Sequence, residues 1–211
     1  MKSNPQTFID TFKENVTRPG AGKLLAYIES TSFFADPASA RYHMNKEGGL
    51  CEHSLNVYNR LRWLCDEEAA KNPKFTRPSD ESIAIVGLLH DLCKVGTYST
   101  ELKNQKTYDF NKVSAAPNYM VKHDNNGDFI WETVPVYVNA DLLPYGHGEK
   151  SVYLIQKYMQ LTDEEAFAIR YHMSSWNDGE KQYASKAFEM YPLAFLAHVA
   201  DEWATYIDEK Q

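Results

Sequence analysis

The chain has 211 residues, 43% hydrophobic and 24% charged, a composition typical of a folded domain and not of a disordered chain. It contains no apolar run of about 18 residues, and its first residues lack the apolar core of a signal peptide. Three cysteines are too few for a disulfide framework, and the net charge of −7 argues against binding nucleic acid through a basic face. We therefore expect one cytoplasmic domain, without a membrane partner.

Helical periodicity begins in the first half of the chain. Apolar side chains at steps of three and four residues predict a helix over about 49–70. Ser79 or Asp80 can cap a second helix, which we expect to continue until Gly96 stops it.

The pattern changes over about 97–145. Short β-prone pieces flank Asn125-Asn126-Gly127, which favours a β-hairpin, and residues 134–138 suggest a further short strand. The aromatic side chains of this segment could cover a pocket or pack on the helices, and we expect packing. They are Tyr98, Tyr108, Phe110, Tyr119, Phe129, Trp131, Tyr137 and Tyr145.

Helices resume after this insertion. One opens at residues 148–151 and continues to about 160, and residues 161–163 cap the next. Pro192 suits the first turn of a last long helix. The fold class predicted from these patterns is all-α, a helical bundle with a small β-hairpin insertion.

Titratable side chains occupy positions where core helices should be apolar. They are His53, the pair His90-Asp91, His172 and Asp201, while His147 lies between two glycines before a predicted helix. Burying such groups without partners costs several kcal/mol, on the order of 2–7 for a neutral polar group. They must therefore have separate partners, satisfy one another or hold a metal ion, and the pattern alone leaves these alternatives open.

Three segments resemble the motifs of one family. His90-Asp91-Leu92-Cys93-Lys94, after an apolar run, resembles the HD-x-x-K motif of the HD-domain superfamily of metal-dependent phosphohydrolases. The segments 48–57 and 196–204 resemble its first and last motifs. The resemblance covers about 40–207 and implies an HD-domain-like bundle as a single domain over 1–211.

The resemblance also implies a set of metal ligands. One ion would be held by His53, His90, Asp91 and Asp201, and a second by His147 and His172 with Asp91 bridging. Mixed nitrogen and oxygen ligands favour Fe, Mn, Zn, Co or Ni, as one or two ions. By this resemblance, hydrolysis would proceed through a metal-activated hydroxide.

Three further side chains are candidates for substrate binding. Lys94 could hold a phosphate oxygen, or it could be a surface lysine near a helix C-terminus. Lys150 lies at a helix start, where anions bind, but could equally be solvated. His43 resembles a histidine that related domains place near the pocket.

The leading hypothesis is therefore hydrolysis of a phosphomonoester or phosphodiester in a small, nucleotide-like substrate, with Asp91 and Lys94 as catalytic residues. Two alternatives stay open: an O2-dependent dinuclear-iron oxygenase on the same scaffold, and a binding module that retains metal without turnover. The sequence does not indicate an oligomeric state.

Overall fold

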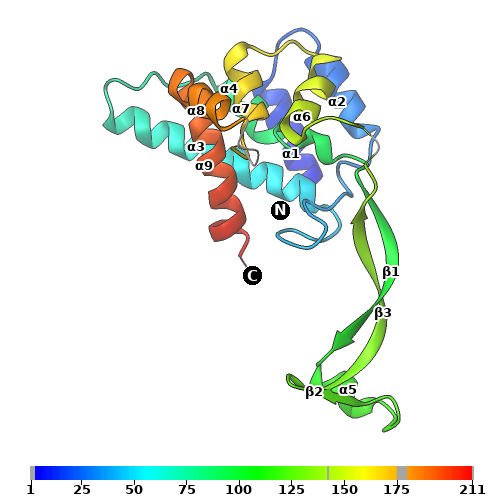
Figure 1. The fold of residues 1–211 in the computed structure, drawn as a ribbon. Coiled ribbons are helices and arrows are strands. Elements are labelled where there is room, and N and C mark those ends of the chain that lie inside the picture. Colours follow the sequence, from blue (N-terminus) through cyan, green and yellow to red (C-terminus); the bar gives the residue numbers. More distant parts are fainter. Residues whose placement is uncertain (1–2, 142, 175–179, 211) are drawn as a thin grey trace.

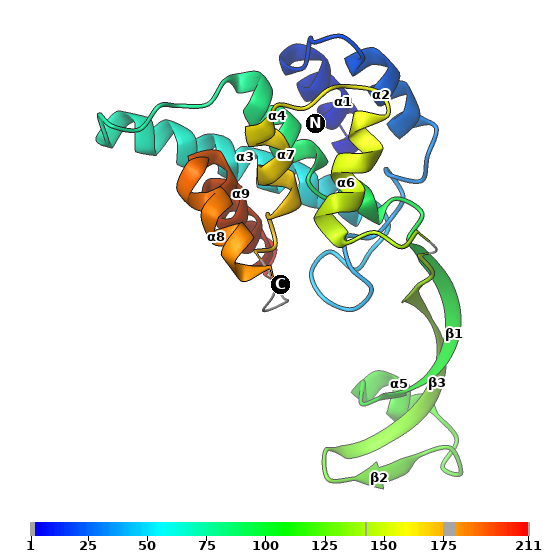
Figure 2. The same ribbon diagram turned by 45° about the horizontal axis from the view of Figure 1, so that its top comes forward.

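The computed structural model describes residues 3–141, 143–174 and 180–210. A mostly helical body carries a long β arm (residues 98–139) that extends away from it (Figures 1 and 2). Nowhere in the described ranges is there a helix with the length and apolar character to span a bilayer. The body contains α1 (Asn4–Asn15), α2 (Ala21–Glu29), α3 (Gly49–Lys71), α4 (Asp80–Leu89), α6 (His147–Gln156), α7 (Asp163–Arg170), α8 (Lys181–Met190) and α9 (Pro192–Trp203).

Helix α4 lies at the centre of this body. Every residue from Ile83 to Leu89 is buried, and α1, α3, α7 and α9 all pack against the helix. Gly87 permits the close approach of α3, because a Cβ at this position would lie 2.6 Å from the Cα of Tyr58. The residues that follow Leu89 therefore enter the interior of the molecule.

The structure confirms two predicted helix starts and corrects one predicted end. The Ser79 hydroxyl accepts a hydrogen bond from the Ser82 amide at 3.0 Å and caps α4, and Thr162 caps α7. The prediction that the second helix continues to Gly96 is wrong. Asp91 leaves helical geometry (φ −101°, ψ 18°), and a short 3₁₀ turn, η1 (Leu92–Lys94), follows.

The β arm is an antiparallel ribbon. β1 (Tyr98–Thr107) pairs with β3 (Gly127–Asn139), and β2 (Lys122–Asp124) pairs with the first residues of β3, so the strand order is β1-β3-β2. The predicted Asn-Gly turn lies between β2 and β3, but the two pieces predicted beyond it form one continuous strand. The short helix α5 (Phe110–Ala115) lies at the far end of the arm (Figure 2).

The expectation that the aromatic side chains of the insertion pack on the helices holds for Tyr145 and is wrong for the far end of the arm. Tyr145 stacks on Tyr153 of α6, with ring centroids 4.7 Å apart. Phe129 instead contacts Tyr108 and Trp131, its neighbours in the arm, at centroid distances of 5.8 and 6.0 Å. The arm thus supplies its own small apolar cluster, away from the body (Figure 1).

Candidate metal centre

The C-terminal end of α4 delivers His90 and Asp91 to the interior. The two residues are 1% and 2% exposed. The His90 amide still donates to the Val86 carbonyl at 3.0 Å, so the imidazole is held at the end of a rigid helix. The buried course of α4 is therefore what places this pair among the other helices.

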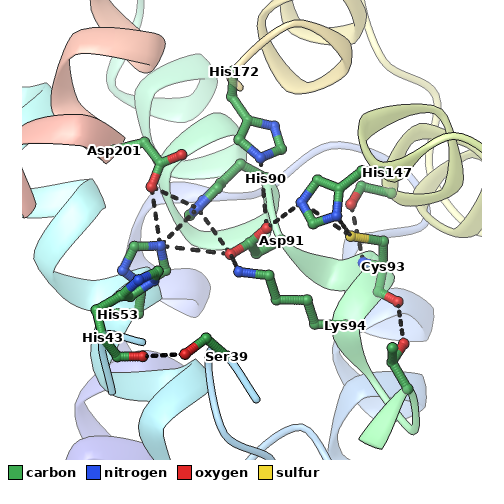
Figure 3. Close-up of polar contacts among 12 residues, drawn as sticks. Ser39, His43, His53, His90, Asp91, Cys93, Lys94, His147, His172 and Asp201 are labelled. Carbon is green, nitrogen blue, oxygen red and sulfur yellow. Dashed lines mark hydrogen bonds and ion pairs between the residues drawn. The ribbon is translucent and has the colours of Figure 1, made fainter. Parts of the chain in front are cut away.

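Helices α3 and α9 bring His53 and Asp201 to one side of this pair. The His53 Nε2 atom lies 3.1 Å from Asp201 Oδ1 and 3.5 Å from Asp91 Oδ2. His90 Nε2 lies 3.5 Å from the same Asp91 oxygen and 3.3 Å from His53 Nε2. Two imidazole nitrogens and two carboxylates therefore surround one point (Figure 3).

The other side of Asp91 meets His147, at the start of α6, and His172, just after α7. Their Nε2 atoms lie 2.8 and 3.5 Å from Asp91 Oδ1. Asp91 thus directs Oδ2 toward one pair of histidines and Oδ1 toward another (Figure 3). The six predicted ligand residues come together, and we call them the His–Asp cluster: His53, His90, Asp91, His147, His172 and Asp201.

In three histidines of the cluster, the contact made by Nδ1 shows which ring nitrogen carries the proton, and it leaves Nε2 as the acceptor atom. The Nδ1 atom of His90 lies 3.0 Å from the Gly87 carbonyl oxygen, and that of His172 lies 2.7 Å from the Ile169 carbonyl oxygen. His53 Nδ1 lies 2.9 Å from a carboxylate oxygen of Glu209. These oxygens accept, so each Nδ1 carries the proton, and a neutral ring presents an Nε2 lone pair to the cluster.

This arrangement fits cations. Lone pairs and carboxylate oxygens converge, and His172 Nε2 is buried without a hydrogen-bond partner. Groups of three potential ligand atoms lie within 4.8 Å of one another on both sides of Asp91. Imidazole nitrogen and carboxylate oxygen are ligands for divalent transition metals, and the two oxygens of Asp91 allow it to contact two ions.

Protonation of the histidines and one lysine supply positive charge that offsets the carboxylates of the cluster. Burial alone would lower the pKa of His53, but Asp201 and Glu209 raise it to about 9. Burial would raise the pKa of Asp91, but Lys94, with Nζ 2.6 Å from Oδ2, and the neighbouring histidines hold it well below its usual value. The cluster therefore attracts positive charge strongly.

A cavity of about 910 Å³ opens beside the cluster. Asp91, Lys94 and Asp201 form part of its wall, and so does His43, whose ring lies 4.7 Å from that of His53. Lys150 lies elsewhere. Its buried ammonium contacts Asp141 at 2.7 Å and Thr97 at 3.2 Å near the base of the arm, so its predicted contact with substrate stays a prediction.

Two neighbours of the cluster were not predicted. Cys93 lies inside the motif, and its Sγ atom is 3.4 Å from Nδ1 of His147. Its position two residues after Asp91 was the only available signal. Glu209 follows the last helix, and no periodicity marks it, because its contact with His53 joins distant parts of the chain.

Comparison with protein families matches residues 50–135 to the HD domain. The matched segment contains α3, α4 and much of the β arm, and it includes His53, His90 and Asp91. Neither the curated proteins nor the solved structures gave a match.

Proposed function

We propose that the chain is a member of the HD-domain superfamily and a metal-dependent phosphohydrolase that acts on a small, nucleotide-like phosphomonoester or phosphodiester; the match of residues 50–135 to the HD domain supports this proposal. The observation that carries the proposal is the convergence of buried acceptor atoms on both sides of Asp91. We also propose that the helical body is an HD-type bundle and that 1–211 is one cytoplasmic domain.

The residues would divide between two ions. The first would be held by His53, His90 and Asp201, and the second by His147 and His172, with Asp91 shared between them. Such ions supply Lewis-acid activation of a phosphoryl group and of water at neutral pH.

The protein would bind and orient the anionic substrate. Lys94 is 13% exposed, lies on the cavity wall and contacts Asp91, so its ammonium is next to the place where a phosphoryl group must sit. Lys46 and Lys210 also line the cavity, and Lys46 is paired with Glu52 at 2.9 Å. A volume of about 910 Å³ accommodates a nucleotide-sized molecule.

The test combines metal analysis with turnover. Purified protein is loaded separately with Mn²⁺, Fe²⁺, Zn²⁺ and Co²⁺ and assayed for phosphate release from nucleotides and from aryl mono- and diesters, with and without O2. We expect O2-independent hydrolysis with at least one metal. Product formation that requires O2 would favour the oxygenase, and metal binding without turnover of any substrate would favour the binding module.

A variant pair tests the shared ligand. Asp91→Ala should lose most of the bound metal and lower turnover by roughly 100-fold or more, because it removes a ligand from both ions. Glu67→Gln is a matched control, because Glu67 is only partly buried, lies at the far end of α3 and pairs with Lys71. Equal metal content in wild type and Asp91→Ala would contradict the assignment.

A further inference from the structure

Glu209 is a buried carboxylate with no role in the proposed reaction. It is 6% exposed, and its Oε1 atom accepts hydrogen bonds from His53 Nδ1 and from Asn56 Nδ2, both at 2.9 Å. Its second oxygen is buried without a hydrogen-bond partner. Burying a carboxylate is costly, so this placement needs a physical reason.

The C-terminal segment is built to deliver this side chain. A π-helical turn, η2 (Ala204–Asp208), follows α9 and shifts the register of the residues after it. Asp208 then forms two bonds with the Arg60 guanidinium, at 2.6 and 3.1 Å. His53, Asn56 and Arg60 recur at steps of three and four along one face of α3, so Asp208 and Glu209 dock side by side on that face.

The hydrogen-bond acceptor of His53 Nδ1 differs in charge from the acceptors of His90 and His172. His90 and His172 donate from Nδ1 to neutral backbone carbonyls, whereas His53 donates to a carboxylate. A carboxylate fixes the tautomer more firmly and makes the opposite ring nitrogen a stronger electron-pair donor. The two halves of the cluster are therefore unequal.

We propose that Glu209 is a positioning residue: it holds His53 with the Nε2 lone pair directed into the cluster, and it thereby makes the half containing His53 and Asp201 the tighter metal site. This inference rests on the proposed function, because it assumes that the cluster binds metal. The proposal predicts a specific effect of the Glu209 carboxylate: the two metal sites differ in affinity.

The experiment titrates metal-free protein with Mn²⁺ or Co²⁺ by calorimetry and measures bound metal by elemental analysis. Glu209→Ala should weaken the tighter site roughly 10- to 100-fold and leave the weaker site unchanged. Glu209→Gln retains an acceptor oxygen for the Nδ1 proton and should recover part of this loss. Glu67→Gln again serves as the control.

The thermal midpoint of metal-free protein separates positioning from a structural role. A loss of metal affinity at the tighter site, with an unchanged thermal midpoint, supports the proposal. If Glu209→Gln and Glu209→Ala lose equal affinity, the carboxylate charge is responsible and positioning through the hydrogen bond is contradicted. Wild-type affinity in Glu209→Ala would overturn it, as would a loss at both sites that accompanies a lowered midpoint. Absence of metal binding by wild type would instead refute the proposed function.

Discussion

Lys94 and Asp91 form a buried ion pair, and we expect it to stabilise metal-free protein more than metal-loaded protein. The ammonium lies 2.6 Å from a carboxylate that is 2% exposed, at a site that also holds Asp201. Removing the ammonium from this buried pair would leave the Asp91 charge with less compensation, because only the neighbouring histidines would then offset it. A bound cation would provide that compensation in place of the lysine.

Lys94→Met should therefore lower the free energy of unfolding of metal-free protein by about 3–5 kcal/mol and have a smaller effect after metal is added. Denaturant titration with and without Mn²⁺ measures both values. Metal content should stay at the wild-type level, while phosphate release on an identified substrate slows. An equal destabilisation in both states would argue that no cation replaces the lysine charge.

Substitution of Gly87 tests the close packing of α4 on α3, which positions His90 and Asp91. Gly87→Ala should destabilise the protein by about 1–3 kcal/mol, because the new methyl group would meet the backbone of α3 at Tyr58. Gly22→Ala, in open space on α2, should be neutral or stabilising by up to about 1 kcal/mol. Denaturant unfolding of both variants provides the comparison, and equal midpoints would contradict the packing argument.

At the scale of elements, a buried ion pair connects the start of α2 with α4 and α7. The Arg18 guanidinium contacts both oxygens of Glu165 at 2.7 Å, and Ser82 of α4 donates to the same carboxylate at 2.8 Å. Glu165 also completes the capping box with Thr162. The Glu165 side chain thus connects α7 with α4 and with the segment before α2.

This carboxylate should contribute to acid sensitivity. Burial alone would raise the pKa of Glu165, but Arg18 and the hydrogen bonds to Thr162 and Ser82 lower it. The stabilisation is then complete above the unfolded-state pKa, about 4.3, and is lost as pH falls through the lower folded-state pKa. Glu165→Gln should destabilise the protein at pH 7, and the difference from wild type should shrink below about pH 4, as measured by denaturant unfolding across pH.

The elements that could be predicted from sequence are helices with recurring apolar positions, whether they bury one face, as α3 and α9 do, or nearly every residue, as α4 does. α3, α4 and α9 carry apolar stripes, and the polar groups on those stripes were visible because they interrupted them. β1 escaped prediction because nearly all of it is exposed on both faces, so its residues do not alternate. α8 buries only two alanines, Ala184 and Ala187, which makes a weak stripe. Glu209 could not be predicted as a neighbour of the cluster, because its placement depends on a π-helical turn.

At the scale of the whole molecule, the body and the arm look separable. The Ala140 amide donates to the Thr97 carbonyl at 2.8 Å and closes the base of the arm. None of the residues in the wall of the cavity belongs to 98–139. Among the described residues, the body alone therefore builds the wall of this cavity.

Replacing residues 99–138 by a short turn should leave metal content within experimental error of wild type and preserve cooperative unfolding of the body. Elemental analysis and thermal unfolding check both expectations. A loss of metal in this variant, with the helices still folded, would show that the arm supports the cluster.

The residues of the His–Asp cluster come from segments that are far apart along the chain, from His53 in α3 to Asp201 in α9. A cation held by both would act as a cross-link across most of the polypeptide, available only to the native state. At a free metal concentration of 100 times Kd, such an ion adds about 2.7 kcal/mol to the free energy of unfolding. Chelators should consequently act on this protein as mild denaturants, and its resistance to proteolysis should follow the metal supply of its surroundings.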